Sequence, residues 1–557
     1  AMCLPNGPEM AVAFLGVVCA AACAPLNPEY REREFEFFLE DLQPKALILM
    51  AGQVSPARTV AEKLGIRILE IEAVTDGPAG TFAFSVEAPP TSGESPQISE
   101  DDIALILHTS GTTSRPKMVP LTHKNLCASA DSVQQMLGLT REDRCLNIMP
   151  LFHIHGLVAA VLASLSAGAC VICTPGFYAP RFFDWIQECR ASWYTAVPTM
   201  HQAILIRAME HRDIIHSHPL RLIRSSSASL PPQVMEELEK TFDAPVLEAY
   251  GMTEAAHQMA SNPLPPRPRK PGSVGPAAGP DIGIMDEAGK LLPAGERGEV
   301  VIRGANVTRG YLNNPEANAS AFVDEWFRTG DQGYLDPDGY LWLTGRIKEI
   351  INRGGEKISP REIDEVLLDH PAVAQAVAFA VPDPRLGEDI AAAVILAPAM
   401  IANERQLREF AATRLADFKV PRLIVIVDEI PKGPTGKIQR IGLAERLDLR
   451  PLAVPGSSTD RAIVLPRTPT EQWLSGLWAE VLHREELSVY DRFLDVGGDS
   501  LLATLLLSRV REALDLEVSM IEFFDAPTIY DQARVIEDLL LIQSDEQTQG
   551  ADGAKDS

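Results

Sequence analysis

The stretch Leu107-His-Thr-Ser-Gly-Thr-Thr-Ser-Arg-Pro-Lys117 places small hydroxyl residues around a glycine, directly after the apolar run Ile103–His108. A short apolar run predicts a buried strand, so the hydroxyl-rich segment is expected to be the loop that follows it. Backbone N–H groups, hydroxyls and a lysine in such a loop can surround phosphate oxygens. The residue order differs from the G-x-x-x-x-G-K-[ST] phosphate loop, so the hypothesis of a kinase or GTPase loses its main support. Taken alone, a loop of this composition is more often a solvated turn.

Short apolar runs alternate with helix-length segments on both sides of this loop, up to about Leu343. The alternation predicts an α/β domain with largely buried sheets. After position 345 the elements become shorter and predict a small α+β domain. The strands expected in the first part are Ala46–Met50, Ile103–His108, Ala169–Cys173, Leu220–Ser225 and Val246–Tyr250; in the second part the expected helices are Ser359–Leu368 and Glu404–Leu415, and the expected strands are Val373–Val381, Ala391–Leu396 and Arg422–Val427.

The C-terminal part of the chain differs in composition. Prolines, a glycine and serines between Arg450 and Pro469 predict an extended connector. Apolar residues at helical spacing over Thr470–Leu541 then predict a four-helix bundle, and the polar residues after it predict disorder. The expected division is a large domain over 1–345, a small domain over 346–447, a linker over 448–468, a helical domain over 469–542 and a disordered tail over 543–557.

The charge of the chain limits its partners. The 557 residues include 50 Lys and Arg against 76 Asp and Glu, a formal net charge of −26. Such a surface repels nucleic acid and anionic lipid, so neither a nucleic acid nor a membrane is an expected partner. The uncharged stretch Met10–Leu26 is too short for a bilayer span and predicts a buried helix rather than a signal peptide.

The cysteines indicate a reducing compartment. All eight lie at or before Cys189. The pair Cys170 and Cys173 has no second pair to complete a zinc site, so both are expected to be structural. Reduced thiols fit a cytoplasmic enzyme.

Four further motifs accompany the hydroxyl-rich loop. They are Tyr250-Gly-Met-Thr-Glu254, Trp326-Phe-Arg-Thr-Gly-Asp331, Gly345-Arg-Ile-Lys-Glu349 and Pro431-Lys-Gly-Pro-Thr-Gly-Lys-Ile438. In order, spacing and wording the five motifs resemble the adenylate-forming superfamily, which includes acyl-CoA synthetases, luciferases and the adenylation domains of nonribosomal peptide synthetases. The resemblance extends from Leu4 to about Arg440.

This resemblance implies an ATP site. Tyr250 would stack on adenine, Asp331 would accept hydrogen bonds from the ribose hydroxyls, and Arg346 would add a cationic fork nearby. Thr253 would bind phosphate and Glu254 would hold Mg²⁺, a cation that prefers oxygen ligands. The residues implied in binding ATP or AMP are Thr109, Ser110, Gly111, Thr112, Thr113, Lys117, Tyr250, Asp331 and Arg346.

Two lysines are implied in the progress of the reaction. Lys437 would reach the substrate carboxylate and the α-phosphate and stabilise the charge that develops as pyrophosphate leaves. Lys348 occupies the position at which the superfamily hinges its small domain. Rotation there would withdraw Lys437 after adenylation and bring the loop 354–357 toward the site for thioester formation.

A second resemblance lies in Phe493-Leu-Asp-Val-Gly-Gly-Asp-Ser-Leu501. This motif is similar to the thiolation or carrier domain of peptide and polyketide synthases, in which the serine carries 4′-phosphopantetheine. A serine before a helix is usually only an N-cap. The motif and its acidic surroundings favour attachment at Ser500, since residues 469–557 contain 19 Asp and Glu against 6 Lys and Arg. The resemblance implies a phosphopantetheinyl transferase as a partner. Loading of the tethered carrier is expected to outrun loading of a separate one.

Four segments surround the implied acyl pocket: Leu151-Phe-His-Ile-His-Gly156, Trp193-Tyr-Thr-Ala-Val-Pro-Thr-Met-His201, Arg224-Ser-Ser-Ser-Ala-Ser229 and Tyr250-Gly-Met-Thr-Glu-Ala-Ala-His257. Their wording is most similar to the oxalate–CoA ligase branch. There, histidines and a serine hold the second carboxylate of the substrate, and the matching residues are His153, Ser227 and His257. Each histidine could equally serve packing or hydrogen bonding. We expect a small polar or dicarboxylic acid, because a fatty-acid tunnel would leave an anion unpaired. An α-amino acid is disfavoured, since His153 stands where aminoacyl domains place an aspartate.

Two features depart from the superfamily's pattern. Lys117 is followed by Met118 where glycine is usual, which bears on how the loop ends. The chain also begins inside what resembles the second strand, so the superfamily's opening segment is expected to be missing.

Three functions follow as hypotheses. The first is an AMP-forming acid–thiol ligase that uses ATP and Mg²⁺ and loads its own carrier for downstream peptide synthetase or polyketide synthase modules. The second is a stand-alone acyl-CoA ligase of the oxalate type that uses free CoA. The third is a scaffold without catalysis, which the presence of Lys437, Glu254 and Asp331 argues against.

Overall fold

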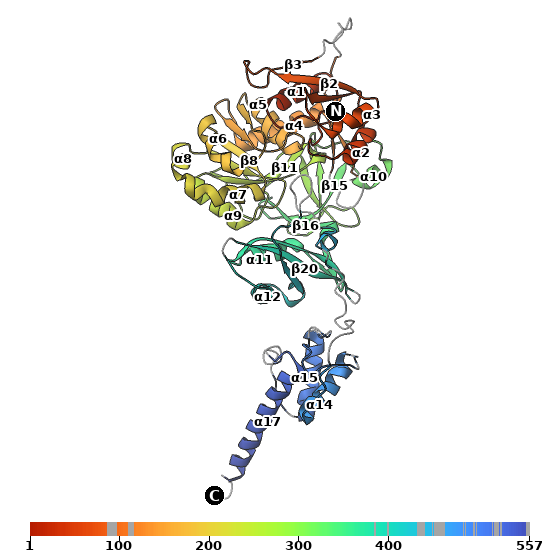
Figure 1. Cartoon of the computed structure of the whole chain (residues 1–557), viewed down its shortest axis with the longest axis vertical. Helices are drawn as coiled ribbons and strands as arrows, with labels where there is room; N and C mark the ends of the chain where they lie inside the picture. The colour runs from red at the N-terminus through yellow and green to blue at the C-terminus, as the bar shows by residue number, and fades with distance from the viewer. Residues whose placement is uncertain are drawn as a thin grey trace. The chain divides into compact units, whose positions relative to one another are not determined.

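Figure 1 shows a computed structural model of the chain. It describes residues 1–85, 97–109, 116–383, 386–397, 400–431, 440–447, 449, 463–482, 484, 486–493, 496, 498, 500–514, 516, 518, 523 and 526–552, with side chains except at 417, 500, 501, 504 and 541–552. The chain forms two compact units, one of residues 1–380 and 388–443 and one of residues 381–387 and 444–557. No helix in the described part of the chain combines the length and hydrophobicity that a bilayer span needs.

A six-stranded sheet forms the centre of the first unit, in the order β11-β10-β9-β8-β6-β7. Strands β6 to β10 run parallel, and β11 pairs antiparallel with β10. Every residue of β8 and β9 is buried, as parallel strands covered on both faces require. The bounds are β6 Arg144–Asn147, β7 Cys170–Cys173, β8 Trp193–Ala196, β9 Leu222–Ser225, β10 Val246–Met252 and β11 His257–Ser261.

Alternate residues of this sheet face two helical layers. Tyr194 and Ile223 pack under α6, α7, α8 and α9, which Figure 1 shows grouped together, whereas Trp193 and Leu222 pack with α4 and η1. This is the period of two that strands impose on their side chains. The bounds are α4 His123–Leu137, η1 (a π-helix) His155–Leu162, α5 Ala163–Ser166, η2 Ala179–Arg181, α6 Phe182–Cys189, α7 Pro198–Ala208, η3 Met209–His211, α8 Arg212–Ser217, α9 Pro232–Phe242 and η4 Thr253–Ala255.

Two small sheets precede the central one in the chain. β1 pairs with β2 in parallel, β3 adds to β2 antiparallel, and β4 and β5 form an antiparallel pair. Helix α1 buries Met10, Phe14 and Val18, which confirms a buried helix in the uncharged stretch. It ends at Val18 because the chain then turns to bridge Cys23 with Leu105 of β4. The bounds are α1 Pro8–Val18, α2 Glu32–Leu42, β1 Ala46–Met50, α3 Pro56–Lys63, β2 Arg67–Ala73, β3 Phe82–Phe84, β4 Ile103–His108 and β5 Met118–Thr122.

An antiparallel sheet in the order β12-β13-β15-β14, with β16 paired to β15, follows the central sheet. It ends the large domain and carries Asp331 on β15 and Arg346 on β16, which are partners in the pairing register. The bounds are β12 Asp281–Met285, β13 Gly298–Arg303, α10 Pro315–Ala321, β14 Phe322–Val323, β15 Trp326–Leu335 and β16 Leu341–Arg346.

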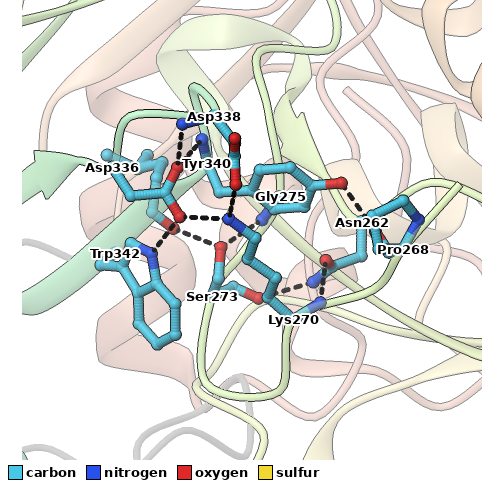
Figure 2. A network of polar contacts seen from close by, with 10 residues as sticks. Asn262, Pro268, Lys270, Ser273, Gly275, Asp336, Asp338, Tyr340 and Trp342 are labelled. Carbon is cyan, nitrogen blue, oxygen red and sulfur yellow. Dashed lines mark hydrogen bonds and ion pairs between the residues drawn. The ribbon is translucent and has the colours of Figure 1, made fainter. Parts of the chain in front are cut away.

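A polar network braces the turn between β15 and β16 against the loop 262–275, as Figure 2 shows. Lys270 Nζ donates to Asp336 Oδ2 at 2.6 Å and to Asp338 Oδ2 at 2.7 Å. Trp342 Nε1 also donates to Asp336, at 3.1 Å, and Tyr340 Oη donates to the carbonyl of Pro268 at 2.6 Å. Desolvation alone would raise the pKa of Asp336, but the hydrogen bonds from Lys270, the backbone of Tyr340 and Trp342 outweigh it and lower the pKa to about 2.

This network makes Asp336 the stabilising partner of the turn. We expect Asp336→Asn to lower the free energy of unfolding by about 2 kcal/mol, because it breaks charge-assisted bonds of a carboxylate that is only 13% exposed. Asp338→Asn is the matched control, since that carboxylate is 72% exposed and should contribute less than about 0.5 kcal/mol. With its pKa lowered from 3.8, Asp336 stabilises the fold above pH 3.8 and loses this effect as the pH falls toward 2. Equal melting temperatures for the two variants at pH 7 would contradict the assignment.

The small domain has a sheet in the order β18-β17-β20-β19, with β21 parallel to β20. The two helices and three strands that the sequence predicts here are found, with small shifts at their ends. Arg361 on α11 donates to the backbone carbonyls of Leu343 (3.0 Å) and Gly272 (3.3 Å), and Ser359 Oγ donates to the carbonyl of Thr344. The bounds are η5 Ile347–Glu349, β17 Ile351–Arg353, β18 Glu356–Ile358, α11 Pro360–Leu368, β19 Val373–Asp383, β20 Gly387–Leu396, α12 Glu404–Ala412, η6 Asp417–Lys419, β21 Leu423–Ile426 and α13 Leu443–Arg446.

The second unit contains α14 Pro469–Leu482, α15 Ser500–Leu514 and α17 Ile529–Asp552. Trp478 is fully buried, lies edge-to-face on Phe493 and donates from Nε1 to Gln532 at 3.0 Å. Gly498 allows the chain to pass close to Phe493, because a Cβ there would lie 2.2 Å from the ring. Helix α17 continues past the expected boundary at 542 to Asp552, because the Asp, Glu and Gln residues after Ile542 can extend a helix; the disorder expected of residues 543–557 stays a prediction.

Candidate functional site

A cavity of about 380 Å³ in the first unit gathers several of the predicted site residues. Its walls come from the carboxyl ends of β9 and β10, from β15 and β16 and from α11. The carboxyl ends of parallel strands are where α/β folds bind ligands, because the following loops diverge there. The lining residues that matter below are Ser227, Tyr250, Gly251, Asp331, Arg346 and Arg440.

Tyr250, Asp331 and Arg346 form one contact group at this cavity. Tyr250 Oη donates to Asp331 Oδ2, and Arg346 Nε lies 3.3 Å from Asp331 Oδ1. The Asp331 carboxylate raises the pKa of Arg346, so the guanidinium stays charged. An aromatic ring beside an acceptor carboxylate and a cation suits a nucleoside phosphate.

Glu254 lies beside a tyrosine that the sequence motifs do not contain. It follows β10 in η4, is 6% exposed and accepts a hydrogen bond from Tyr311 Oη at 2.9 Å. Lys117 Nζ stands 4.6 Å over the Tyr311 ring, so Tyr311 connects the end of the hydroxyl-rich loop to Glu254. Burial raises the pKa of Glu254. Thr253 precedes it in the same turn.

The hydroxyl-rich loop itself lies partly outside the described residues. Ser110, Gly111, Thr112 and Thr113 fall in the undescribed stretch, whereas its two ends are described. Thr109 N donates to the carbonyl of Lys117 at 3.0 Å, so β4 and β5 hold both ends together. The Met118 that departs from the superfamily pattern is the first residue of β5.

Mg²⁺ fits this part of the site. Among the described residues no group of three His, Cys, Asp or Glu side chains could hold a metal by itself. Mg²⁺ commonly binds one or two carboxylates and completes its shell with water and substrate phosphates, so the single buried carboxylate of Glu254 suffices.

Lys437 lies outside the described residues, and Arg440 is the first described residue after it. Arg440 lines the cavity and binds Asp364 through two nitrogens, at 3.2 and 2.5 Å. Arg440 Nε also lies 3.4 Å from Glu349, the neighbour of Lys348 in η5. Arg440 therefore connects Asp364 on α11 with Glu349, the neighbour of the predicted hinge residue Lys348.

A cluster of buried polar residues lies behind Ser227. His155 Nδ1 is 3.0 Å from Ser227 Oγ, and the His155 ring stacks on that of His257 with centroids 4.9 Å apart. The imidazole in these contacts thus belongs to His155, two residues after the predicted His153. His153 Nδ1 instead accepts a hydrogen bond from the backbone N–H of His155 at 3.3 Å. His155 begins the π-helix η1, a rare conformation that is frequent at functional sites.

The backbone around this cluster is unusual. The backbone angle φ is 73° at Ser227, 47° at Ala256 and 98° at His257, values that residues other than glycine rarely adopt. Such backbone conformations persist where the surrounding structure holds the residue in place, and they are frequent at active sites and ligand-binding sites. Gly251 permits the close approach of β10 to β11, because a Cβ there would lie 1.7 Å from the carbonyl oxygen of His257.

The cluster also contains Arg224, which the sequence analysis does not select. Arg224 lies on β9, is 0% exposed and contacts both His155 and His257. A signal for it was present, since an arginine within the buried run 222–225 has no place in an apolar core. Glu248 is a second unselected residue: it lines the cavity, and burial raises its pKa to about 7.

Ser500 is the first residue of α15. Its side chain is outside the described set, so the structure gives only its place at the helix N-terminus. A serine there follows the turn that Gly498 makes against Phe493.

Comparison with known proteins gives three family matches. Residues 1–312 match the AMP-binding enzyme family, residues 362–437 match the AMP-binding enzyme C-terminal domain, and residues 472–536 match the phosphopantetheine attachment site. The three matches lie in turn within the segments 1–345, 346–447 and 469–542 that the sequence predicts as domains.

Individual proteins are similar over most of the chain. The chain is 47% identical over 456 residues to the oxalate–CoA ligase of Arabidopsis thaliana, covering 81% of this chain and 88% of that protein. It is 36% identical over 448 residues to the sulfoacetate–CoA ligase of Cupriavidus necator, covering 79% and 86%. The solved structure of McyG A-PCP complexed with phenylalanyl-adenylate superposes with a TM-score of 0.75 over 96% of this chain and 89% of that one. At 21% identity that likeness shows the fold alone.

Proposed function

We propose that this chain, which belongs to the family of AMP-binding, adenylate-forming enzymes, loads its own carrier domain. The premise is that the chain is an acid–thiol ligase and contains that carrier domain. It activates a carboxylic acid as an acyl-adenylate and passes the acyl group to the thiol of phosphopantetheine on Ser500. The observation that carries this proposal is the presence of both an ATP site and a carrier domain on one chain. Covalent tethering raises the concentration of the acceptor at the adenylate.

Residues of the cavity, of the turn after β10 and of the predicted motifs fit the first half of this reaction. Tyr250 and Asp331 bind the nucleoside, Arg346 and the loop 109–117 bind phosphates, and Glu254 holds Mg²⁺. Lys437 stabilises the charge on the attacking carboxylate and the α-phosphate. When attached, phosphopantetheine supplies the nucleophilic thiol for the second half, and Lys348 is the hinge that exchanges one half for the other.

The acid is a small one with a second anionic group. The support is the cluster behind Ser227, which gathers two imidazoles, a hydroxyl and a buried arginine. Two relatives bear the names of oxalate and sulfoacetate ligases, and each of these acids has two anionic groups. A phosphopantetheinyl transferase is then a required partner, and downstream peptide synthetase or polyketide synthase modules are the expected consumers.

A second candidate is an acyl-CoA ligase that uses free CoA. The similar proteins favour this function, because they are named as CoA ligases and their similarity covers about four fifths of this chain. In that case the carrier would serve another purpose.

The test is the intact mass of the phosphopantetheinylated protein after incubation with ATP, Mg²⁺ and acids from oxalate to fatty acids. Self-loading predicts an acyl mass increment on the protein with a short dicarboxylic acid, and the same increment when equimolar free CoA is added. If the arm stays unacylated while acyl-CoA forms in solution, the CoA-ligase function is correct. Equal loading with oxalate and a long-chain fatty acid would overturn the predicted substrate class.

A further inference from the structure

The buried guanidinium of Arg224 binds four side chains, and none of them is acidic. Its NH1 donates to His155 Nε2 and to Thr195 Oγ1, both at 3.4 Å. Its NH2 donates to His257 Nε2 at 3.2 Å and to Gln258 Oε1 at 2.9 Å. Within the part of the chain that the structure describes, no carboxylate forms an ion pair with it. Its Nε and the Nε2 of Gln258 have no hydrogen-bond partner there either.

A cation in this position is costly for the fold. Removing a charge from water costs several kcal/mol unless an opposite charge compensates it. Burial lowers the pKa of Arg224 to about 9, so the group is still charged at neutral pH. Other arginines of the chain show the usual solution: Arg221, three residues earlier, pairs with Asp143 at 2.8 Å and is 36% exposed. An anion that arrives with the substrate would supply the missing compensation.

The contacts of Arg224 also fix the two histidines. A guanidinium can only donate hydrogen bonds, so Nε2 of His257 accepts from Arg224. Nε2 of His155 lies 3.4 Å from Arg224 NH1 and 2.6 Å from Thr195 Oγ1, which itself accepts from Arg224 NH1 and has its own proton to donate to the ring. We infer that each ring accepts at Nε2 and carries its proton on Nδ1. The Nδ1–H of His155 then donates to Ser227 Oγ at 3.0 Å. Because Ser227 Oγ accepts this hydrogen bond, the hydroxyl proton of Ser227 points away from His155. Ser227 lines the cavity, and Nδ1 of His257 lies beside Gly251, which also lines it.

We propose that Arg224 determines the preference of this site for acids with a second anionic group. This inference rests on the proposed adenylation of a small acid. Arg224 does not touch the substrate; it is a positioning residue that orients both imidazoles as donors and gives the pocket its positive charge. Successive hydrogen bonds of one direction polarise each other, so the chain Arg224, His155, Ser227 presents a strengthened donor to the cavity.

The experiment compares each of three dicarboxylic acids (oxalate, malonate and succinate) with its own monoamide, by ATP-dependent pyrophosphate release. The monoamide has the same shape but lacks the second charge. For the preferred acid we expect Arg224→Gln to lower kcat/KM about 100-fold through KM, and to change kcat/KM for its monoamide less than about threefold. Arg224→Lys should retain part of the preference because it keeps the charge. Arg221→Gln is the matched control and should leave the ratio of acid to monoamide unchanged.

A second variant separates charge from folding. Gln258→Glu places a carboxylate against Arg224 NH2, which neutralises the cation and leaves the arginine in position; it should remove the preference as Arg224→Gln does. If folded Arg224→Gln and Gln258→Glu both keep the wild-type ratio, the inference is wrong although the proposed function stands. If the wild-type enzyme releases pyrophosphate only with monocarboxylic acids that lack a second charged group, both the substrate class and the role of Arg224 are wrong.

Discussion

Ser500→Ala is expected to abolish the acyl mass increment on the protein completely, while acid-dependent pyrophosphate release continues at the wild-type initial rate. The reason is that Ser500 is the implied attachment point of phosphopantetheine, and the proposed adenylation site, the cavity with Tyr250 and Asp331, lies in the other unit of the chain. Intact-protein mass and pyrophosphate release measure the two halves separately.

Ser508→Ala is the matched control for this variant. Ser508 lies on the same helix, α15, and its side chain is exposed, so the substitution repeats the chemical change without touching the attachment point. It should load as the wild type does. A thioester on Ser500→Ala equal to that on Ser508→Ala would contradict the self-loading proposal.

Lys437→Met is expected to slow adenylation by about 10²- to 10³-fold, the usual loss when a single group that stabilises developing charge is removed. Thioester formation from a supplied acyl-adenylate should remain within a few fold of wild type, because hinge rotation at Lys348 would by then have withdrawn Lys437. The measurements are ATP–pyrophosphate exchange for the first step and carrier mass for the second.

Lys432→Met is the matched control, since Lys432 belongs to the same Gly- and Pro-rich motif. It removes the same charge five positions away and should leave exchange nearly unchanged. If Lys437→Met slowed both steps equally, the lysine would act through the stability of the small domain rather than on the charge of the first step.

The sequence predicts the strands well where the local pattern is strong. β1 and β4 have the bounds expected of them, because an apolar run of five or six residues is too short for a typical helix and is typical of a buried strand. The extent of α17 was not predictable in this way, since a polar segment can be a solvated helix or disordered.

The site residues that belong to a sequence motif were predictable, whereas those that the packing of distant segments brings to the site were not. Tyr250, Asp331 and Arg346 belong to separate motifs, and the structure brings them together. Tyr311 lies in no motif, and its contact with Glu254 depends on the path of the chain after β13. The contact of His155 with Ser227 depends on where the π-helix begins, which two histidines in one apolar segment do not reveal, and the role of His153 stays a prediction.

The contacts between α11 and the large domain bear on how such enzymes could be recombined. Arg361 and Ser359 bind carbonyl oxygens of Leu343, Thr344 and Gly272, and so contact the main chain rather than particular side chains. Every sequence offers the same carbonyls on a strand of the same shape. A small domain transplanted from a relative should therefore seat against β16 without redesign of that strand, which makes the boundary after Arg346 a natural crossover point for chimeric ligases.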